Sequence, residues 1–209
     1  MPHIALLGDS VFDNQSYTDA EPDVVTHLRA ILPAAWSATL LAVDGATTRS
    51  LPPPVSKVPR DTTHLVVSIG GNDALGNIDL LDAPARSTAD ALTLFGARAG
   101  AFEIHYRSAI RAVRALNLPM VVCTIYNGDL PDRRQAALAR VALMMFNDAI
   151  LRTAFEHRAS VIDLRPMCAE PADYANLIEP SGRGGLKIAQ AVTQATGAEA
   201  GCDGTRVYC

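Results

Sequence analysis

The chain has 209 residues, of which 49% are hydrophobic and 19% are charged, a balance typical of a globular protein and not of a disordered one. Its net charge of −4 provides no basic surface for nucleic acid or anionic membranes. No apolar run approaches the roughly 20 residues that a membrane-spanning helix needs. The apolar run at residues 3–7 is too short for a signal peptide, so we expect a cytoplasmic protein unless a leader has been removed.

Short apolar runs alternate with longer helical patterns along the whole chain. In chain order we expect a strand at 3–8, a helix at 22–32, strands at 37–43 and 64–69, a helix at 86–116, a strand at 120–125, a helix at 133–155, a strand at 160–164 and a helix at 185–196. This alternation indicates parallel βαβ units, and the continuous apolar strands indicate a sheet covered on both faces. The pattern therefore predicts one α/β domain over residues 1–209.

In such a sheet, ligands bind outside the carboxyl ends of the strands. The loops that follow the five expected strands should share this rim, and they cover residues 8–14, 44–48, 70–77, 125–131 and 165–184. Residues 126–135 would form either a lid or a plain polar connection.

Three short motifs lie on the rim. Gly8-Asp9-Ser10 follows the first strand, where a serine at a tight turn exposes its hydroxyl, although this tripeptide alone is more often a turn with a helix cap. Asp44-Gly45-Ala46 follows the second strand and Gly70-Gly71-Asn72-Asp73 the third, and each alone is an ordinary turn. Together, the N–H groups of Ser10 and Gly45 and the Asn72 amide would provide three donors for an oxyanion. Each such donor is worth roughly 2.7–4 kcal/mol in acyl transfer.

These motifs resemble the first three blocks of the SGNH (GDSL) hydrolases, a family of esterases, lipases, thioesterases and carbohydrate deacetylases. The resemblance covers nearly the whole chain. It implies a flavodoxin-like three-layer α/β/α sandwich with a five-stranded parallel sheet, in which Ser10 is the nucleophile and Ser10, Gly45 and Asn72 form the oxyanion hole. The implied activity is hydrolysis of a small-molecule carboxylic ester, with a short or medium acyl chain, through an acyl-Ser10 intermediate and without a cofactor.

The last block departs from the family pattern, D-x-x-H followed by Pro-Ser. Here Asn176 replaces the aspartate and Glu179 replaces the histidine, before Pro180-Ser181. The chain's histidines precede strands at the far rim or lie in helices or at their ends: His3, His64, His27, His105 and His157. A glutamate can take the Ser10 proton if burial raises its pKa above the usual value of about 4.3.

The Asn176 amide is expected to orient Glu179 by donating a hydrogen bond to its carboxylate, and Asp173 is a weaker candidate for the orienting or base role. Alternatively, Glu179 is an exposed carboxylate before a proline. The chain would then either work slowly with Ser10 and the oxyanion hole alone, or bind an acyl or acetylated ligand without turnover. A phosphate- or flavin-binding protein of the same fold is a third alternative, but the chain has no glycine-rich or Ser/Thr-rich phosphate loop.

The remaining expectations concern the pocket and the cysteines. Leu75, Ile78, Leu80 and Leu81 would line an acyl pocket or pack under a long loop. The four cysteines lack the paired spacing of a zinc site. Cys123 is expected to be buried, Cys168 to lie in loop-like sequence, and Cys202 and Cys209 to be able to form a disulfide in an oxidising compartment. The sequence does not indicate an oligomeric state.

Overall fold

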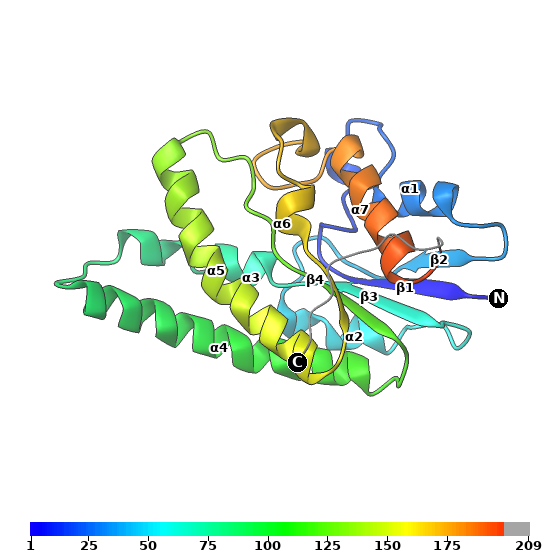
Figure 1. The fold of residues 1–209 in the computed structure, drawn as a ribbon, viewed down its shortest axis with the longest axis horizontal. Helices are drawn as coiled ribbons and strands as arrows, with labels where there is room; N and C mark the ends of the chain where they lie inside the picture. Colours follow the sequence, from blue (N-terminus) through cyan, green and yellow to red (C-terminus); the bar gives the residue numbers. More distant parts are fainter. Residues whose placement is uncertain (199–209) are drawn as a thin grey trace.

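A computed structural model describes residues 1–198 (Figure 1). Its centre is a sheet of five parallel strands, β1 (His3–Gly8), β2 (Ser37–Leu40), β3 (His64–Ser68), β4 (Met120–Cys123) and β5 (Ser160–Ile162). The strand order is β2-β1-β3-β4-β5, which is the flavodoxin-like order. All five strands begin where the sequence pattern predicted. β2, β4 and β5 end two or three residues earlier than expected, and β3 ends one residue earlier.

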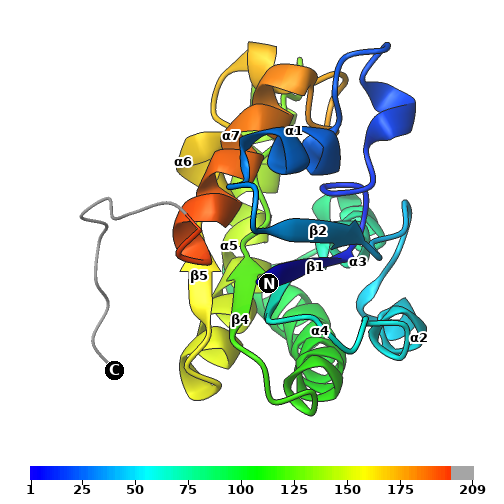
Figure 2. The same ribbon diagram turned by 90° about the vertical axis from the view of Figure 1, so that its right-hand side faces the viewer.

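Two layers of helices cover the sheet because successive side chains of a strand point to opposite faces. In β1, Ile4 and Leu6 pack with α1 (Val24–Ile31), α6 (Leu164–Met167) and α7 (Gly182–Ala195). Ala5 and Leu7 pack on the other face with α2 (Pro52–Val55), α4 (Thr88–Arg114) and α5 (Arg133–Glu156). Figure 2 shows the two layers edge-on. The structure thus confirms the expected three-layer α/β/α fold.

The helices α4 and α5 pack against each other and extend beyond the carboxyl ends of the strands (Figure 1). The 27 residues of α4 span about 40 Å, whereas a strand of five residues spans about 17 Å. The N-terminal halves of these helices therefore have no strand to cover. Their apolar side chains are available to form a wall beside the rim.

The connecting segments include α3 (Gly71–Leu75) and the 3-10 helices η1 (Gln15–Tyr17), η2 (Thr48–Ser50), η3 (Ile78–Asp82) and η4 (Pro171–Asp173). Cys123 is buried as expected, and Cys168 is buried too. A disulfide between Cys202 and Cys209, which the sequence would allow in an oxidising compartment, lies outside the described residues. Among residues 1–198, no helix combines the length and apolar character needed to cross a membrane.

Candidate active site

Ser10 is brought to the rim by a sharp turn at the end of β1. Gly8 has a φ of +132°, and a Cβ there would lie 1.7 Å from the Ser68 carbonyl oxygen of the neighbouring strand, so only glycine fits. The Asp9 N–H donates to the same carbonyl at 3.0 Å, which turns the chain away from the sheet. Ser10 follows this turn, is 8% exposed and lines a cavity at the rim.

The Ser10 hydroxyl donates a hydrogen bond to Glu179, 169 residues further along the chain, with 3.1 Å between Oγ and Oε1. Glu179 is only 6% exposed, so it is not the surface carboxylate of the alternative interpretation. Burial raises the pKa of Glu179, the Ser10 hydrogen bond lowers it, and the negative charge of Asp44 raises it. The second carboxylate oxygen, Oε2, is buried and has no hydrogen-bond partner within residues 1–198.

The two other predicted oxyanion donors have different positions. Asn72 lines the same cavity as Ser10, and its Nδ2 donates to the Ala46 carbonyl at 3.0 Å, which leaves its second N–H available. Gly45 has the expected left-handed conformation, with a φ of +74°, but it is not among the residues that line the cavity. Among the described hydrogen bonds, the backbone N–H groups of Ser10 and Gly45 donate none.

The predicted contact between the Asn176 amide and the Glu179 carboxylate is absent, and that expectation was wrong. Instead, Asn176 Oδ1 accepts hydrogen bonds from the backbone N–H groups of Ile178 and Glu179, both at 2.9 Å. The physical reason is local, because an asparagine side chain readily accepts from N–H groups two or three residues ahead and closes a turn. Asn176 therefore shapes the backbone that carries Glu179 and does not contact the carboxylate.

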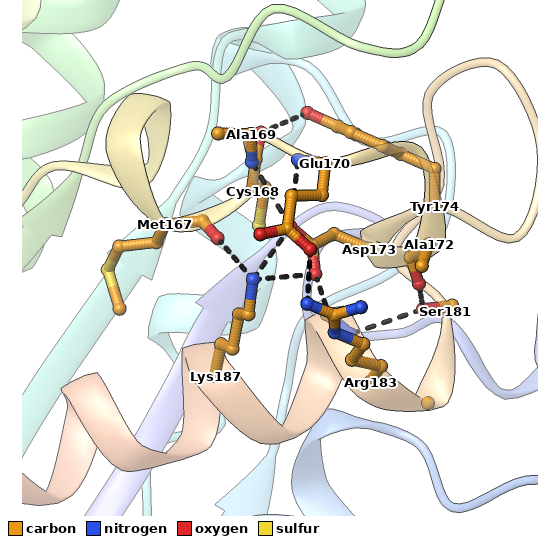
Figure 3. A network of polar contacts seen from close by, with 12 residues as sticks. Met167, Cys168, Ala169, Glu170, Ala172, Asp173, Tyr174, Ser181, Arg183 and Lys187 are labelled. Atoms are coloured by element: carbon orange, nitrogen blue, oxygen red, sulfur yellow. Dashed lines mark hydrogen bonds and ion pairs between the residues drawn. The ribbon is translucent and has the colours of Figure 1, made fainter.

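Asp173, the weaker candidate, lies in a separate ion pair (Figure 3). Its carboxylate is fully buried, lies 2.7 Å from Lys187 Nζ, and accepts hydrogen bonds from the backbone N–H groups of Ala169 and Glu170. Burial would raise the pKa of Asp173, but the bonds from Lys187 and Glu170 outweigh it and hold the pKa below its usual value. The pair joins η4 to α7, and no described interaction joins Asp173 to the Ser10 hydroxyl.

The cavity beside Ser10 has a volume of about 580 Å³ and a largely apolar lining. The four leucine and isoleucine side chains that were predicted for an acyl pocket all line it: Leu75, Ile78, Leu80 and Leu81. The sequence interpretation missed the opposite wall, which comes from the segment after β4 and the overhanging halves of α4 and α5: Tyr126, Leu130, Phe95, Leu138, Leu143 and Phe146. The expected helix lengths, much greater than the strand lengths, were the signal for that wall.

Sequence reasoning also missed a second buried carboxyl group next to Ser10. Asp9 lines the cavity and accepts a hydrogen bond from the Val11 N–H at 3.2 Å. Burial, with a smaller contribution from the charge of Glu179, raises the pKa of Asp9 to about 7.

Within residues 1–198, no group of three or more His, Cys, Asp or Glu side chains is arranged to hold a metal ion.

The histidines lie outside the lining of this cavity. None of the five lines the cavity: His3, His27, His64, His105 and His157.

The sequence model of the GDSL-like Lipase/Acylhydrolase family matches residues 6–184, most of the chain. The chain belongs to this family. As a GDSL-like hydrolase it is a carboxylic-ester hydrolase, one in which Glu179 lies beside Ser10.

Solved structures share the fold of this GDSL-like hydrolase at low sequence identity. An extracellular lipase from Streptomyces rimosus superposes with a TM-score of 0.70 at 15% identity, over 93% of this chain and 100% of that one. A phospholipase A1 from Streptomyces albidoflavus gives 0.66 at 16% identity, over 91% and 98%. The W215I variant of Axe2, an acetyl xylan esterase from Geobacillus stearothermophilus, gives 0.67 at 17% identity, over 96% and 97%. No sequence among the curated proteins matches the chain.

Proposed function

We propose that this protein is a serine esterase that hydrolyses short- to medium-chain carboxylic esters through an acyl-Ser10 intermediate, with Glu179 as the general base. The observation that carries the proposal is the 3.1 Å hydrogen bond from Ser10 Oγ to Glu179 Oε1, beside an apolar cavity of about 580 Å³. A nucleophile within hydrogen-bond reach of a base, next to space for an acyl chain, is the arrangement that acyl transfer requires.

In the proposed reaction, the Glu179 carboxylate accepts the Ser10 proton while Oγ attacks the ester carbonyl carbon. The oxyanion that forms receives hydrogen bonds from the free N–H groups of Ser10 and Gly45 and from the second N–H of the Asn72 amide. Protonated Glu179 then returns the proton to the departing alcohol oxygen as the carbon–oxygen bond breaks. Water, activated by Glu179 in the same way, releases the acid and restores Ser10.

The environment of Glu179 supports its use as a base in place of a histidine. An exposed glutamate is a weak base for a hydroxyl because its pKa lies far below neutral pH. Burial raises the pKa of Glu179 and therefore strengthens it as a proton acceptor. We expect kcat/KM to rise with pH as Glu179 loses its proton, at a midpoint above that of an exposed glutamate, and Glu179→Gln to abolish this limb.

Hydrolysis of p-nitrophenyl butyrate and labelling by a fluorophosphonate test the proposal. Ser10→Ala should abolish labelling and turnover, while the exposed Ser56→Ala serves as a matched control. Glu179→Ala and Glu179→Gln should each lose most turnover, because neither side chain accepts the proton as a carboxylate does. Undiminished kcat in either Glu179 variant would rule out the base assignment.

A second candidate is a catalytically impaired protein that binds an acyl or acetylated ligand. It is favoured because Glu179 Oε2 has no hydrogen-bond partner among the described residues, whereas a base is normally oriented by another group. Saturable binding of an acyl ligand by the wild-type protein, without labelling or turnover, would select this candidate over the esterase.

A further inference from the structure

The backbone on both sides of Glu179 is tied to the rest of the protein by an unbroken series of hydrogen bonds. We call residues 175–180 the Glu179 loop. Its four carbonyl groups from 177 to 180 all accept, each from a different donor: Leu177 from the Asp129 N–H at 2.8 Å, Ile178 from the Tyr126 hydroxyl at 2.6 Å, Glu179 from the Ala175 N–H at 2.8 Å, and Pro180 from Asn14 Nδ2 at 3.0 Å. The Ala175 N–H lies within the loop and closes it, whereas the other three donors lie outside the loop and tie it to the rest of the protein.

The C-terminal end of the loop is anchored in the ion pair of Figure 3. The Ser181 N–H donates to the Asp173 carbonyl at 2.9 Å, and the Asp173 side chain is held by Lys187 of α7. This anchor fixes where the loop begins and ends. The orientation of the residues between these ends depends on the four carbonyl contacts.

Two of the four contacts come from buried side chains of distant segments. Asn14 is fully buried and joins two elements, since its Oδ1 accepts from the Val24 N–H at the start of α1 while its Nδ2 donates to Pro180. Tyr126 follows β4, and its ring lines the cavity beside Ser10 while its hydroxyl reaches the Ile178 carbonyl. These two side chains hold the carbonyl groups of the residues immediately before and after Glu179.

Glu179 needs such support because its side chain has no orienting partner of its own. In a Ser-His-Asp triad the base is aligned by a hydrogen bond that it donates to a third side chain. Here Oε2 has no hydrogen-bond partner within residues 1–198, and Asn176 contacts only backbone N–H groups. The alignment of Oε1 with the Ser10 hydroxyl must therefore come from the backbone.

We propose that Tyr126 and Asn14 are positioning residues, which hold the Glu179 loop so that Oε1 meets the Ser10 hydroxyl. They replace, through the backbone, the orienting contact that a third catalytic side chain normally makes. The inference rests on the proposed role of Glu179 as the base, and it extends that role to two residues that touch neither the substrate carbonyl nor the Ser10 hydroxyl.

Two conservative substitutions test the inference. Tyr126→Phe removes the hydroxyl but keeps the ring in the cavity, so KM should stay within about twofold while kcat falls. Asn14→Asp keeps an acceptor for the Val24 N–H but loses the donor to Pro180. We expect each variant to lower kcat by about tenfold, the upper end of what one neutral hydrogen bond contributes.

The pH profile separates positioning from a purely structural role. Burial is the main cause that raises the pKa of Glu179, so a loosened loop that admits water should shift the ascending limb to lower pH. Tyr174→Phe is the matched control, because its hydroxyl makes an equally short bond of 2.6 Å to a carbonyl outside the loop, that of Cys168. Tyr174→Phe should keep the wild-type kcat, and its rate should rise with pH at the same midpoint as in the wild-type protein.

Rates are normalised to the folded fraction measured by circular dichroism. An unchanged kcat in Tyr126→Phe and Asn14→Asp, or a loss of kcat with an unmoved limb, overturns the positioning role. If either result is found while Glu179→Gln is inactive, the proposed function of Glu179 stands and only the positioning role of Tyr126 and Asn14 is overturned. Turnover that survives in Ser10→Ala instead overturns the proposed function itself.

Discussion

If the cavity beside Ser10 receives the acyl chain, its apolar lining predicts how the rate depends on chain length. Each methylene that leaves water contributes about 0.8 kcal/mol, which is about fourfold in kcat/KM. From acetate to hexanoate, four methylenes enter the cavity and contribute about 3 kcal/mol, on the order of 200-fold in kcat/KM. This is an upper value, because the cavity opens to solvent and the chain loses conformational freedom on binding.

A substitution in the wall should flatten this dependence. Ala142 of α5 lines the cavity, so Ala142→Phe fills part of it. Ala137 lies on the exposed side of the same helix, so Ala137→Phe is a matched control. We expect kcat/KM for p-nitrophenyl esters from acetate to octanoate to rise with length in the wild-type and the control, and to rise little in Ala142→Phe.

The acetate rate should change little in all three proteins, because an acetyl group does not reach far into the cavity. A wild-type series with equal kcat/KM from acetate to hexanoate would show that the acyl chain does not occupy the cavity. The same conclusion would follow if Ala142→Phe retained the full dependence on length.

Two further predictions concern stability. Because burial raises the pKa of Asp9 from 3.8 to about 7, the folded state binds more protons than the unfolded state between these values, so stability should fall as pH rises through this window. In urea denaturation Asp9→Asn should flatten this slope, and an unchanged slope would contradict the reasoning. Lys187→Met removes the ammonium partner of the buried Asp173 carboxylate and should cost about 3 kcal/mol. This is the low end of the range for a broken buried pair, because Lys187 is partly exposed and Arg183 Nε remains 3.4 Å from the carboxylate. The melting temperature should fall by roughly 6–12 °C, whereas a fall under about 2 °C would mean that the pair contributes little.

The secondary structure was readable from the sequence because its signals are local. Continuous apolar runs such as 3–8 and 64–69, and helical periodicity over 86–116 and 133–155, depend only on neighbours along the chain. The strand order then followed from the resemblance of the motifs to a known family. The same local reasoning predicted that Ser10 and Asn72 share one rim, and the family resemblance implied that Glu179 stands where a histidine is usual.

Other features were decided only when distant segments packed together. The hydrogen bond between Ser10 and Glu179 joins residues far apart in the chain, and so does the contact of Tyr126 with the Glu179 loop. The burial that raises the pKa of Asp9 and of Glu179 likewise depends on distant segments. The direction in which Asn176 bonds was misjudged for a related reason, since the sequence names its donors and acceptors but not the backbone groups around it. Periodicity determines which residues form strands and helices, whereas desolvation and side-chain orientation depend on what the rest of the chain brings against them.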